Sequence, residues 1–309
     1  MNWTGVMPAA TTPFDSKLAV NHDLLEQHSA WLLENGCTGL VMLGSLGEGA
    51  TLDYDEKLAI LKTALKAAAK HKAPVVASIS SLSTAASVRL AKEAEQLGCS
   101  GLMVLPPYIY STDWREMKAH VDAVLKATPL SAMLYNNPVA YTTDYLPEQI
   151  AELAAEHENL QAVKESSTDV RRITAIKALL GDRLVLFTGV DDVIVEAVHA
   201  GSTGWVAGLV NAFPAESVAL FELASAGRWE EAFALYRWFL PLLRLDTVPK
   251  FVQLIKWVQE ETGTGLAATR PPRLSLTGED LAHAQSVLKA ALANRPAVRS
   301  TPFPTAVKA

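Results

Sequence analysis

Three segments of the chain repeat one pattern. Residues 36–44, 98–105 and 201–208 each begin with a glycine, two small residues and a second glycine, and then run through apolar residues. The first glycine suits the left-handed position that ends a helix. A continuous apolar run is typical of a parallel strand buried on both faces. Each segment therefore predicts a helix end, a tight loop and a buried strand.

Five further strands of this kind are predicted, at 5–11, 75–79, 131–135, 160–164 and 184–188. Helical stretches with apolar residues three and four apart separate the strands, at 24–33, 54–69, 84–97, 114–127, 147–155, 170–180 and 192–199. Eight strands with a helix in each of the seven gaps predict an α/β fold, a (β/α)8 TIM barrel. A doubly wound open sheet is the structural rival, but the GxGxxG signature after its first strand is missing.

The chain continues well beyond the eighth strand, and four more helices are predicted, at 214–226, 229–245, 249–262 and 278–292. We therefore divide the chain into three parts. Residues 1–210 carry the barrel strands and most helices, and residues 211–295 form the last barrel helix plus a C-terminal helical extension. Three prolines interrupt residues 296–309, which predicts a loose tail.

Composition narrows the function classes. The 309 residues are 50% hydrophobic and 19% charged, enough for a large core, and the net charge of −6 without a basic stripe disfavours nucleic acid as a partner. Cys37 and Cys99 are too few for a secreted disulfide framework. The N-terminal residues lack a signal peptide pattern, and the apolar runs are too short to span a membrane. These features predict a cytoplasmic protein.

Lys164 is the most informative residue, because it is the only lysine that closes a predicted buried strand. In a TIM barrel the chemistry lies at the C-terminal ends of the strands. Burial lowers the pKa of an amine and makes it a nucleophile for carbonyl carbons. A Schiff base to a 2-oxo acid would then act as an electron sink. The alternative is a structural lysine paired with Glu165.

Tyr135 closes the preceding strand, so its side chain and Lys164 should lie close together at one mouth of the barrel. A phenol in this position can move protons. A tyrosine at a core edge is the structural alternative. The loop Gly44-Ser45-Leu46-Gly47-Glu48 brings backbone N–H groups and a hydroxyl to the same mouth, where they could bind a carboxylate or merely make a turn.

The other strand ends supply further candidates for substrate binding. Asp191 could hold substrate hydroxyls or cap the helix that follows. We expect substrate contacts from Gly44, Leu46, Gly47, Thr11, Tyr108, Asn137, Gly189, Asp191 and Gly208. The histidines are scattered and form no metal motif, so no metal site is expected.

Taken together, the strand ends resemble those of the dihydrodipicolinate synthase / N-acetylneuraminate lyase family of Schiff-base lyases. The resemblance rests on Gly44-Ser45-x-Gly47-Glu48, Tyr135-Asn136-x-Pro138, Lys164-Glu165 and Gly189-x-Asp191, in the family's order and spacing. It implies that Lys164 attacks the 2-oxo carbon and that Tyr135 relays protons. It also implies that Ser45 hydrogen-bonds Tyr135 or the substrate carboxylate, while Glu48 braces the loop without reacting. The family's members are usually homotetramers, built as a dimer of dimers, and need no cofactor.

Three positions depart from the synthase pattern. Leu46 stands where the family's loop has a second hydroxyl residue. Ile109 stands where the synthase has a tyrosine that enters the neighbouring subunit's site, although Tyr110 is one step away. Ala140 stands where the synthase has an arginine for its aldehyde substrate. An apolar residue at the place of Leu46 is similar to two other branches, the deaminase of hydroxyproline breakdown and the aromatic hydratase-aldolases.

The resulting prediction is a lyase that forms a Schiff base with a small 2-oxo acid. It would break or form a carbon–carbon bond, or remove water or ammonia. The enzyme alternative is 4-hydroxy-tetrahydrodipicolinate synthase, which condenses pyruvate with aspartate semialdehyde. The non-enzyme alternative is a barrel that binds a 2-oxo acid without turnover, because a fold alone never establishes activity.

Overall fold

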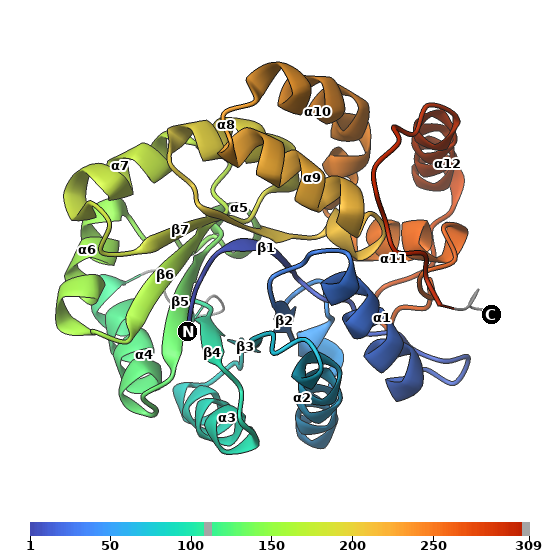
Figure 1. The fold of residues 1–309 in the computed structure, drawn as a ribbon. Coiled ribbons are helices and arrows are strands. Elements are labelled where there is room, and N and C mark those ends of the chain that lie inside the picture. The colour runs from blue at the N-terminus through green and yellow to red at the C-terminus, as the bar shows by residue number, and fades with distance from the viewer. Residues whose placement is uncertain (108–112, 305–309) are drawn as a thin grey trace.

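The computed structural model describes residues 1–107 and 113–304. Its centre is a sheet of eight parallel strands in the order β1-β8-β7-β6-β5-β4-β3-β2 (Figure 1). The strands are β1 (Gly5–Pro8), β2 (Leu40–Met42), β3 (Val75–Ile79), β4 (Gly101–Val104), β5 (Ser131–Asn136), β6 (Leu160–Glu165), β7 (Val185–Thr188) and β8 (Gly204–Ala207). A bridge between Ala9 and Val41 brings the two edge strands together. The predicted TIM barrel is confirmed.

Helices surround the strands, one or more in each interval of the chain (Figure 1). They are α1 (His22–Glu34), α2 (Tyr54–Ala69), α3 (Thr84–Leu97), α4 (Trp114–Lys126), α5 (Pro138–Tyr141), α6 (Pro147–Glu156), α7 (Arg171–Leu180), α8 (Ile194–Ala200) and α9 (Pro214–Ser225). The short helix α5 was not predicted from the sequence. It begins with a proline and places its last residue, Tyr141, beside the end of β5.

The three repeated segments behave as predicted. Gly36, Gly98 and Gly201 have φ of +94°, +93° and +115°, the left-handed region that a residue with a Cβ rarely adopts. Gly98 and Gly201 are the C-cap residues of α3 and α8. In each segment the strand follows within a few residues and is fully buried.

Side chains alternate between two cores, because successive residues of a strand point to opposite faces. One core fills the barrel and includes Met133, Tyr135, Ala162 and Phe187. The other lies between strands and helices and includes Leu134 and Val163. This alternation directs Tyr135 into the barrel and predicts the same direction for Lys164, two residues after Ala162.

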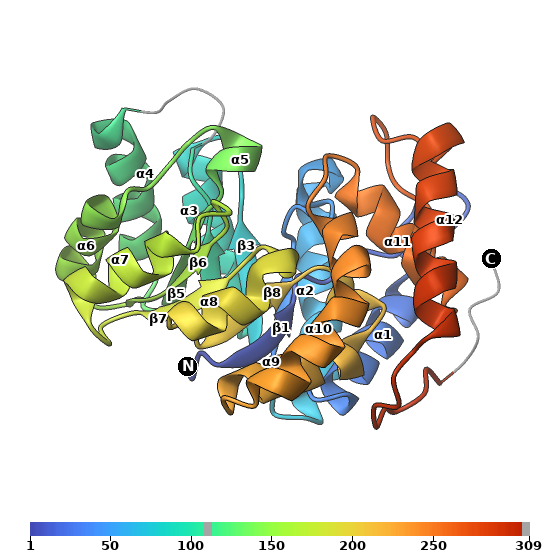
Figure 2. The ribbon, with the colours of Figure 1, turned by 90° about the horizontal axis from the view of Figure 1, so that it is seen from above.

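The C-terminal extension consists of α10 (Trp229–Leu243), α11 (Phe251–Glu261) and α12 (Gly278–Ala293). Figure 2 shows these helices on one side of the molecule, with α12 outermost and α6 and α7 on the opposite side. The described part of the tail is not loose, contrary to the sequence prediction. The Thr301 carbonyl accepts a hydrogen bond of 2.7 Å from Trp31 Nε1, and the Phe303 ring packs edge-on against Trp31. The apolar residue between two of the prolines, Phe303, thus attaches this segment to the rest of the protein. The number of prolines alone does not indicate such a contact.

In the described part of the chain, no helix combines the length and the apolar composition needed to cross a membrane. Both cysteines are buried and free. Burial raises the pKa of both thiols, that of Cys99 to about 12. Neither thiol is therefore a reactive thiolate at neutral pH.

Candidate active site

A cavity of about 540 Å³ opens at the carboxyl ends of the strands. Most of the predicted site residues line it: Gly44, Ser45, Leu46, Tyr135, Asn137, Lys164, Gly189 and Gly208. Ligand sites of TIM barrels occur at this end of the barrel. The cavity is therefore the candidate active site.

Lys164 and Tyr135 are direct neighbours in this cavity. They are partners in the parallel register of β5 and β6, and both side chains are about 95% buried. Lys164 Nζ lies over the Tyr135 ring, 4.0 Å from its centroid. The predicted closeness of the two residues is confirmed. Glu165 does not pair with the lysine, since its carboxylate accepts hydrogen bonds from Asn136 Nδ2 at 3.1 Å and from the Ser167 backbone N–H at 2.6 Å.

The absence of a side chain at residue 189 makes room for the lysine. A Cβ at Gly189 would lie 2.2 Å from Lys164 Cε and 2.1 Å from Ser166 Oγ. Both distances are far below van der Waals contact. Gly189, directly after β7, thus leaves space for the lysine side chain, and it also lines the cavity.

Burial lowers the pKa of Lys164 to about 8. The negative charges of Asp246 and Asp191 act in the opposite direction and favour the ammonium form. The balance leaves a substantial fraction of neutral amine near neutral pH, which is what nucleophilic attack on a carbonyl requires.

Asp246 was missed by the sequence analysis. It lies in the 3-10 turn after α10 and lines the cavity at the end of β8. A Cβ at Gly208 would lie 2.0 Å from Asp246 Oδ1, so this glycine lets the carboxylate reach the barrel mouth. Burial raises the pKa of Asp246 well above its usual value, and the nearby Lys164 charge opposes that shift. A site residue so far along the chain from the barrel strands leaves no local sequence signal.

The Asp191 carboxylate is fully buried and does not line the cavity. It accepts hydrogen bonds from Trp205 Nε1 at 3.0 Å and from the backbone N–H groups of Gly208 and Leu209 at 3.1 and 2.8 Å. The expected contact with substrate is therefore corrected: the carboxylate fixes the backbone after β8. Burial raises its pKa to about 6, and these hydrogen bonds oppose the rise.

Ser45 forms a hydrogen bond with Tyr141, the last residue of α5. Of the two expected partners, Tyr135 is not the one bound, and the substrate carboxylate stays a prediction. The Tyr141 ring in turn meets the Tyr135 ring edge-on, with centroids 5.9 Å apart. The Tyr135 hydroxyl accepts a hydrogen bond of 3.0 Å from Asn137 Nδ2, and this bond opposes the effect of burial on the Tyr135 pKa. Burial dominates, and the Tyr135 pKa is raised, so the phenol is protonated at neutral pH.

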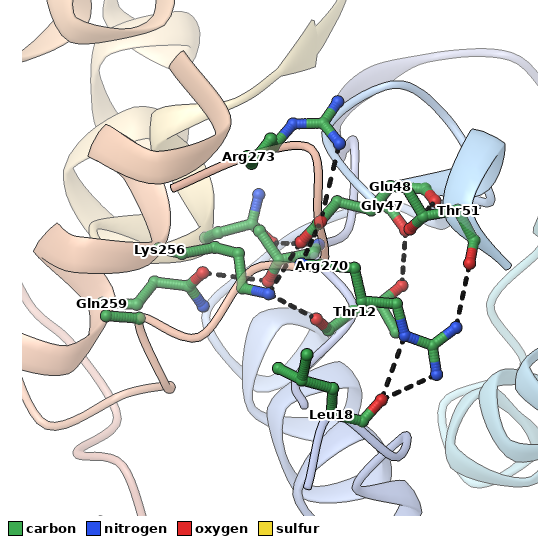
Figure 3. A network of polar contacts seen from close by, with 12 residues as sticks. Thr12, Leu18, Gly47, Glu48, Thr51, Lys256, Gln259, Arg270 and Arg273 are labelled. Atoms are coloured by element: carbon green, nitrogen blue, oxygen red, sulfur yellow. Dashed lines mark hydrogen bonds and ion pairs between the residues drawn. The ribbon is translucent and has the colours of Figure 1, made fainter. Parts of the chain in front are cut away.

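Glu48 is fully buried behind the loop and binds several groups at once (Figure 3). Its carboxylate accepts hydrogen bonds of 2.9 Å from Lys256 Nζ and 3.0 Å from the Arg270 backbone N–H. Glu48 itself has φ of +54°, and Leu43 has φ of +65°. Conformations of this kind persist where the surroundings hold them. The buried ion pair thus fixes the loop that carries Ser45.

Two further expected contact residues, Thr11 and Gly47, do not line the cavity, and a third is not described by the structure. Thr11 is buried away from the cavity and donates a hydrogen bond of 2.9 Å to Gln259 Oε1, which corrects its expected role. Gly47 does not line the cavity either, and its carbonyl accepts a hydrogen bond of 2.7 Å from Thr12 Oγ1. Tyr108 lies outside the described residues, as do Ile109 and Tyr110.

A sequence model of the Dihydrodipicolinate synthetase family matches residues 2–291. The chain belongs to this family. Among its relatives is the 4-hydroxy-tetrahydrodipicolinate synthase of Geotalea uraniireducens (strain Rf4), 32% identical over 78% of this chain and 81% of the relative. The enzyme of the same name from Moorella thermoacetica is 29% identical over 94% of this chain and 98% of the relative.

Solved structures give the same family. The 4-hydroxy-tetrahydrodipicolinate synthase of Methylacidiphilum fumariolicum SolV is similar with a TM-score of 0.91 and 25% identity, over 94% of this chain and 97% of that one. Enzymes of the dihydrodipicolinate synthetase family are aldolase-type lyases that use a lysine Schiff base.

Proposed function

We propose that the protein is a lyase whose Lys164 forms a Schiff base with a 2-oxo acid of the pyruvate type. The observation that carries this proposal is the register pair of Lys164 and Tyr135 at the barrel mouth. The pair combines an amine of lowered pKa with a protonated phenol in one cavity. No other pair of described cavity residues joins a nucleophilic amine to a proton donor in this way.

The reaction begins with attack of the neutral Lys164 amine on the 2-oxo carbon, which gives a carbinolamine. Loss of water, with a proton supplied to the departing hydroxyl, gives the imine and leaves the substrate bonded through Nζ. Tyr135 supplies that proton and takes one up again when the adjacent carbon reacts. The Ser45 loop binds the substrate carboxylate through its hydroxyl and backbone N–H groups.

The second step depends on what the imine meets. The relatives named 4-hydroxy-tetrahydrodipicolinate synthase favour condensation with aspartate semialdehyde as one candidate. Leu46 and Ala140 line the cavity where that enzyme has a hydroxyl residue and an arginine, which favours a different partner or an elimination. A coupled assay with pyruvate and aspartate semialdehyde decides: turnover of about 1–1000 per second identifies the synthase reaction.

The assembly and location are part of the proposal as well. We infer a homotetramer, on the resemblance to the family alone, and size-exclusion chromatography with light scattering tests it. A cytoplasmic location is supported by two buried free thiols, which suit a reducing compartment.

The decisive experiment is reduction with borohydride in the presence of pyruvate, followed by mapping of the modified peptide. The chain offers an internal control: burial also lowers the pKa of Lys256 to about 8, but this lysine is held by Glu48 outside the cavity. We expect the adduct on Lys164 and none on Lys256. Binding of pyruvate by calorimetry without an adduct or turnover would instead identify a binding protein.

A further inference from the structure

Arg273 brings a second positive charge to the cavity of Lys164. It lies in the segment between α11 and α12 and lines the same cavity as the lysine. Among the described residues that line the cavity, Lys164 and Arg273 are the only lysine or arginine. The sequence analysis did not single it out, because nothing in its neighbourhood marks a strand end.

The contacts of Arg273 leave its charge only partly balanced. Its Nη1 lies 3.6 Å from Glu48 Oε2, beyond a normal hydrogen bond. Lys256 already pairs with the other carboxylate oxygen at 2.9 Å. Glu48 therefore faces two cations with one negative charge. Figure 3 shows the Arg273 guanidinium reaching Glu48 through one nitrogen, with another directed away from that carboxylate.

Arg270, in the same segment, has a guanidinium group that is fully hydrogen-bonded within the protein. Arg270 donates to both carboxylate oxygens of Glu56, at 2.7 and 2.6 Å, and to the Leu18 and Thr51 carbonyls. Arg270 does not line the cavity. Arg273 makes no comparable set of bonds with the residues that the structure describes, and 26% of its side chain is exposed. Its guanidinium is thus able to bind a further anion.

The volume of the cavity and its other charged groups are compatible with a substrate longer than pyruvate. A cavity of about 540 Å³ exceeds the needs of a three-carbon acid. The only acidic residue among the described lining residues is Asp246, whose charge is offset by Lys164. An Arg–carboxylate pair is planar and often bidentate, which gives it both strength and direction.

We propose that Arg273 binds a second anionic group of the substrate, so that the cavity is built for a 2-oxo acid with a further carboxylate. This inference rests on the proposed Schiff-base function and adds the class of substrate. The first carboxylate belongs to the 2-oxo end near Lys164. The second carboxylate binds Arg273, in the segment between α11 and α12.

The test compares 2-oxo acids of equal length with and without a terminal carboxylate. The pairs are 2-oxoglutarate with 2-oxopentanoate, and 2-oxoadipate with 2-oxohexanoate. For each acid, the concentration that half-saturates borohydride trapping on Lys164 is measured in the wild type, Arg273→Gln, Arg273→Lys and Arg237→Gln. Arg237 is an exposed residue of α10 outside the cavity, so its variant controls for the loss of one positive charge.

We expect at least one dicarboxylic acid to half-saturate at about tenfold lower concentration than its matched partner, as a charge-assisted hydrogen bond allows. Arg273→Gln should abolish that preference and weaken dicarboxylate trapping far more than pyruvate trapping, and Arg273→Lys should keep part of the preference. Arg237→Gln should behave as the wild type.

Three outcomes overturn the inference. The first is a wild type that does not prefer either dicarboxylic acid. The second is an Arg273→Gln protein that keeps the preference. The third is a folded Arg273→Gln protein that loses pyruvate trapping as strongly as dicarboxylate trapping, which would make Arg273 a general support of the site. Absence of any adduct in the wild type, pyruvate included, refutes the proposed function itself and this inference with it.

Discussion

Lys164 Nζ lies over the face of the Tyr135 ring, 4.0 Å from its centroid, and the two residues are register partners on neighbouring strands. The ring face attracts the ammonium form, whereas burial favours the neutral amine. In the proposed mechanism the phenol supplies the proton that imine formation requires. The pair thus joins the proposed nucleophile to its proposed proton donor.

Replacing Lys164 by alanine should abolish the borohydride adduct and reduce turnover to the background. Lys164→Arg should be equally inactive, because a guanidinium remains protonated and cannot attack a carbonyl carbon. Peptide mapping and the turnover rate provide the readouts, and circular dichroism provides the control for folding. A Lys164→Ala protein that turns over at the wild-type rate would refute the Schiff-base mechanism.

The rate of adduct formation should rise with pH and level off above about 8. The Lys164 pKa is lowered to about 8, so the reactive neutral amine is the minor form below that pH and the major form above it. Asp246 favours the ammonium form. Asp246→Asn should therefore lower the lysine pKa and move the profile to lower pH. A profile unchanged by this substitution would show that the carboxylate does not act on Lys164.

The sequence predicted the parts of this molecule that depend on local pattern. Glycine at helix ends, continuous apolar strands and periodic helices identified all eight strands and nearly every helix. The closeness of Lys164 and Tyr135 could be predicted because the carboxyl ends of parallel strands lie at the same mouth of the barrel. The boundaries of α2 and α3 agree with the predicted ranges 54–69 and 84–97, and the structure has Asp53 and Ser83 as the N-cap residues of these helices.

The contributions of Tyr141, Asp246 and Arg273 to the cavity were not predictable in the same way. Tyr141 depends on a one-turn helix after β5, and the other two come from a helical extension whose packing leaves no periodic signal. The sequence analysis did identify Asp191, but it did not predict the partners of this residue. The Asp191 carboxylate accepts hydrogen bonds from the backbone N–H groups of Gly208 and Leu209.

Gly189→Ala should strongly impair imine formation while leaving the barrel folded. The new Cβ would lie 2.2 Å from Lys164 Cε, so the lysine side chain has to move away from its place over Tyr135. We expect the trapping rate to fall about a hundredfold, as a misplaced reacting group allows. The rate of adduct formation is measured at a fixed pyruvate concentration by quenching the borohydride reaction at successive times. Thermal unfolding tests whether the variant is folded. A rate within twofold of the wild type would contradict the steric role.

Glu48→Gln should destabilise the protein without direct involvement in chemistry. The substitution leaves the buried Lys256 ammonium without its charged partner, and breaking a buried pair in this way costs about 3–5 kcal/mol. Urea denaturation measures the loss. In the double variant Glu48→Gln/Lys256→Met the unpaired charge is gone, and part of the stability should return. No recovery would mean that the loop conformation, and not the buried charge, carries the cost.

Tyr141→Phe should slow the proton-transfer steps through Ser45 and Tyr135. The phenylalanine keeps the edge-on ring contact with Tyr135 but removes the hydroxyl that is hydrogen-bonded to Ser45. We expect kcat to fall by about tenfold to a hundredfold, within the range of a positioned acid–base group. Ser45→Ala should cause a similar loss. If the three hydroxyls act as one chain, the double variant Ser45→Ala/Tyr141→Phe should be no slower than the worse single variant, because the chain is already broken. Multiplied losses would instead show that Ser45 and Tyr141 act independently, with Ser45 serving the substrate carboxylate alone.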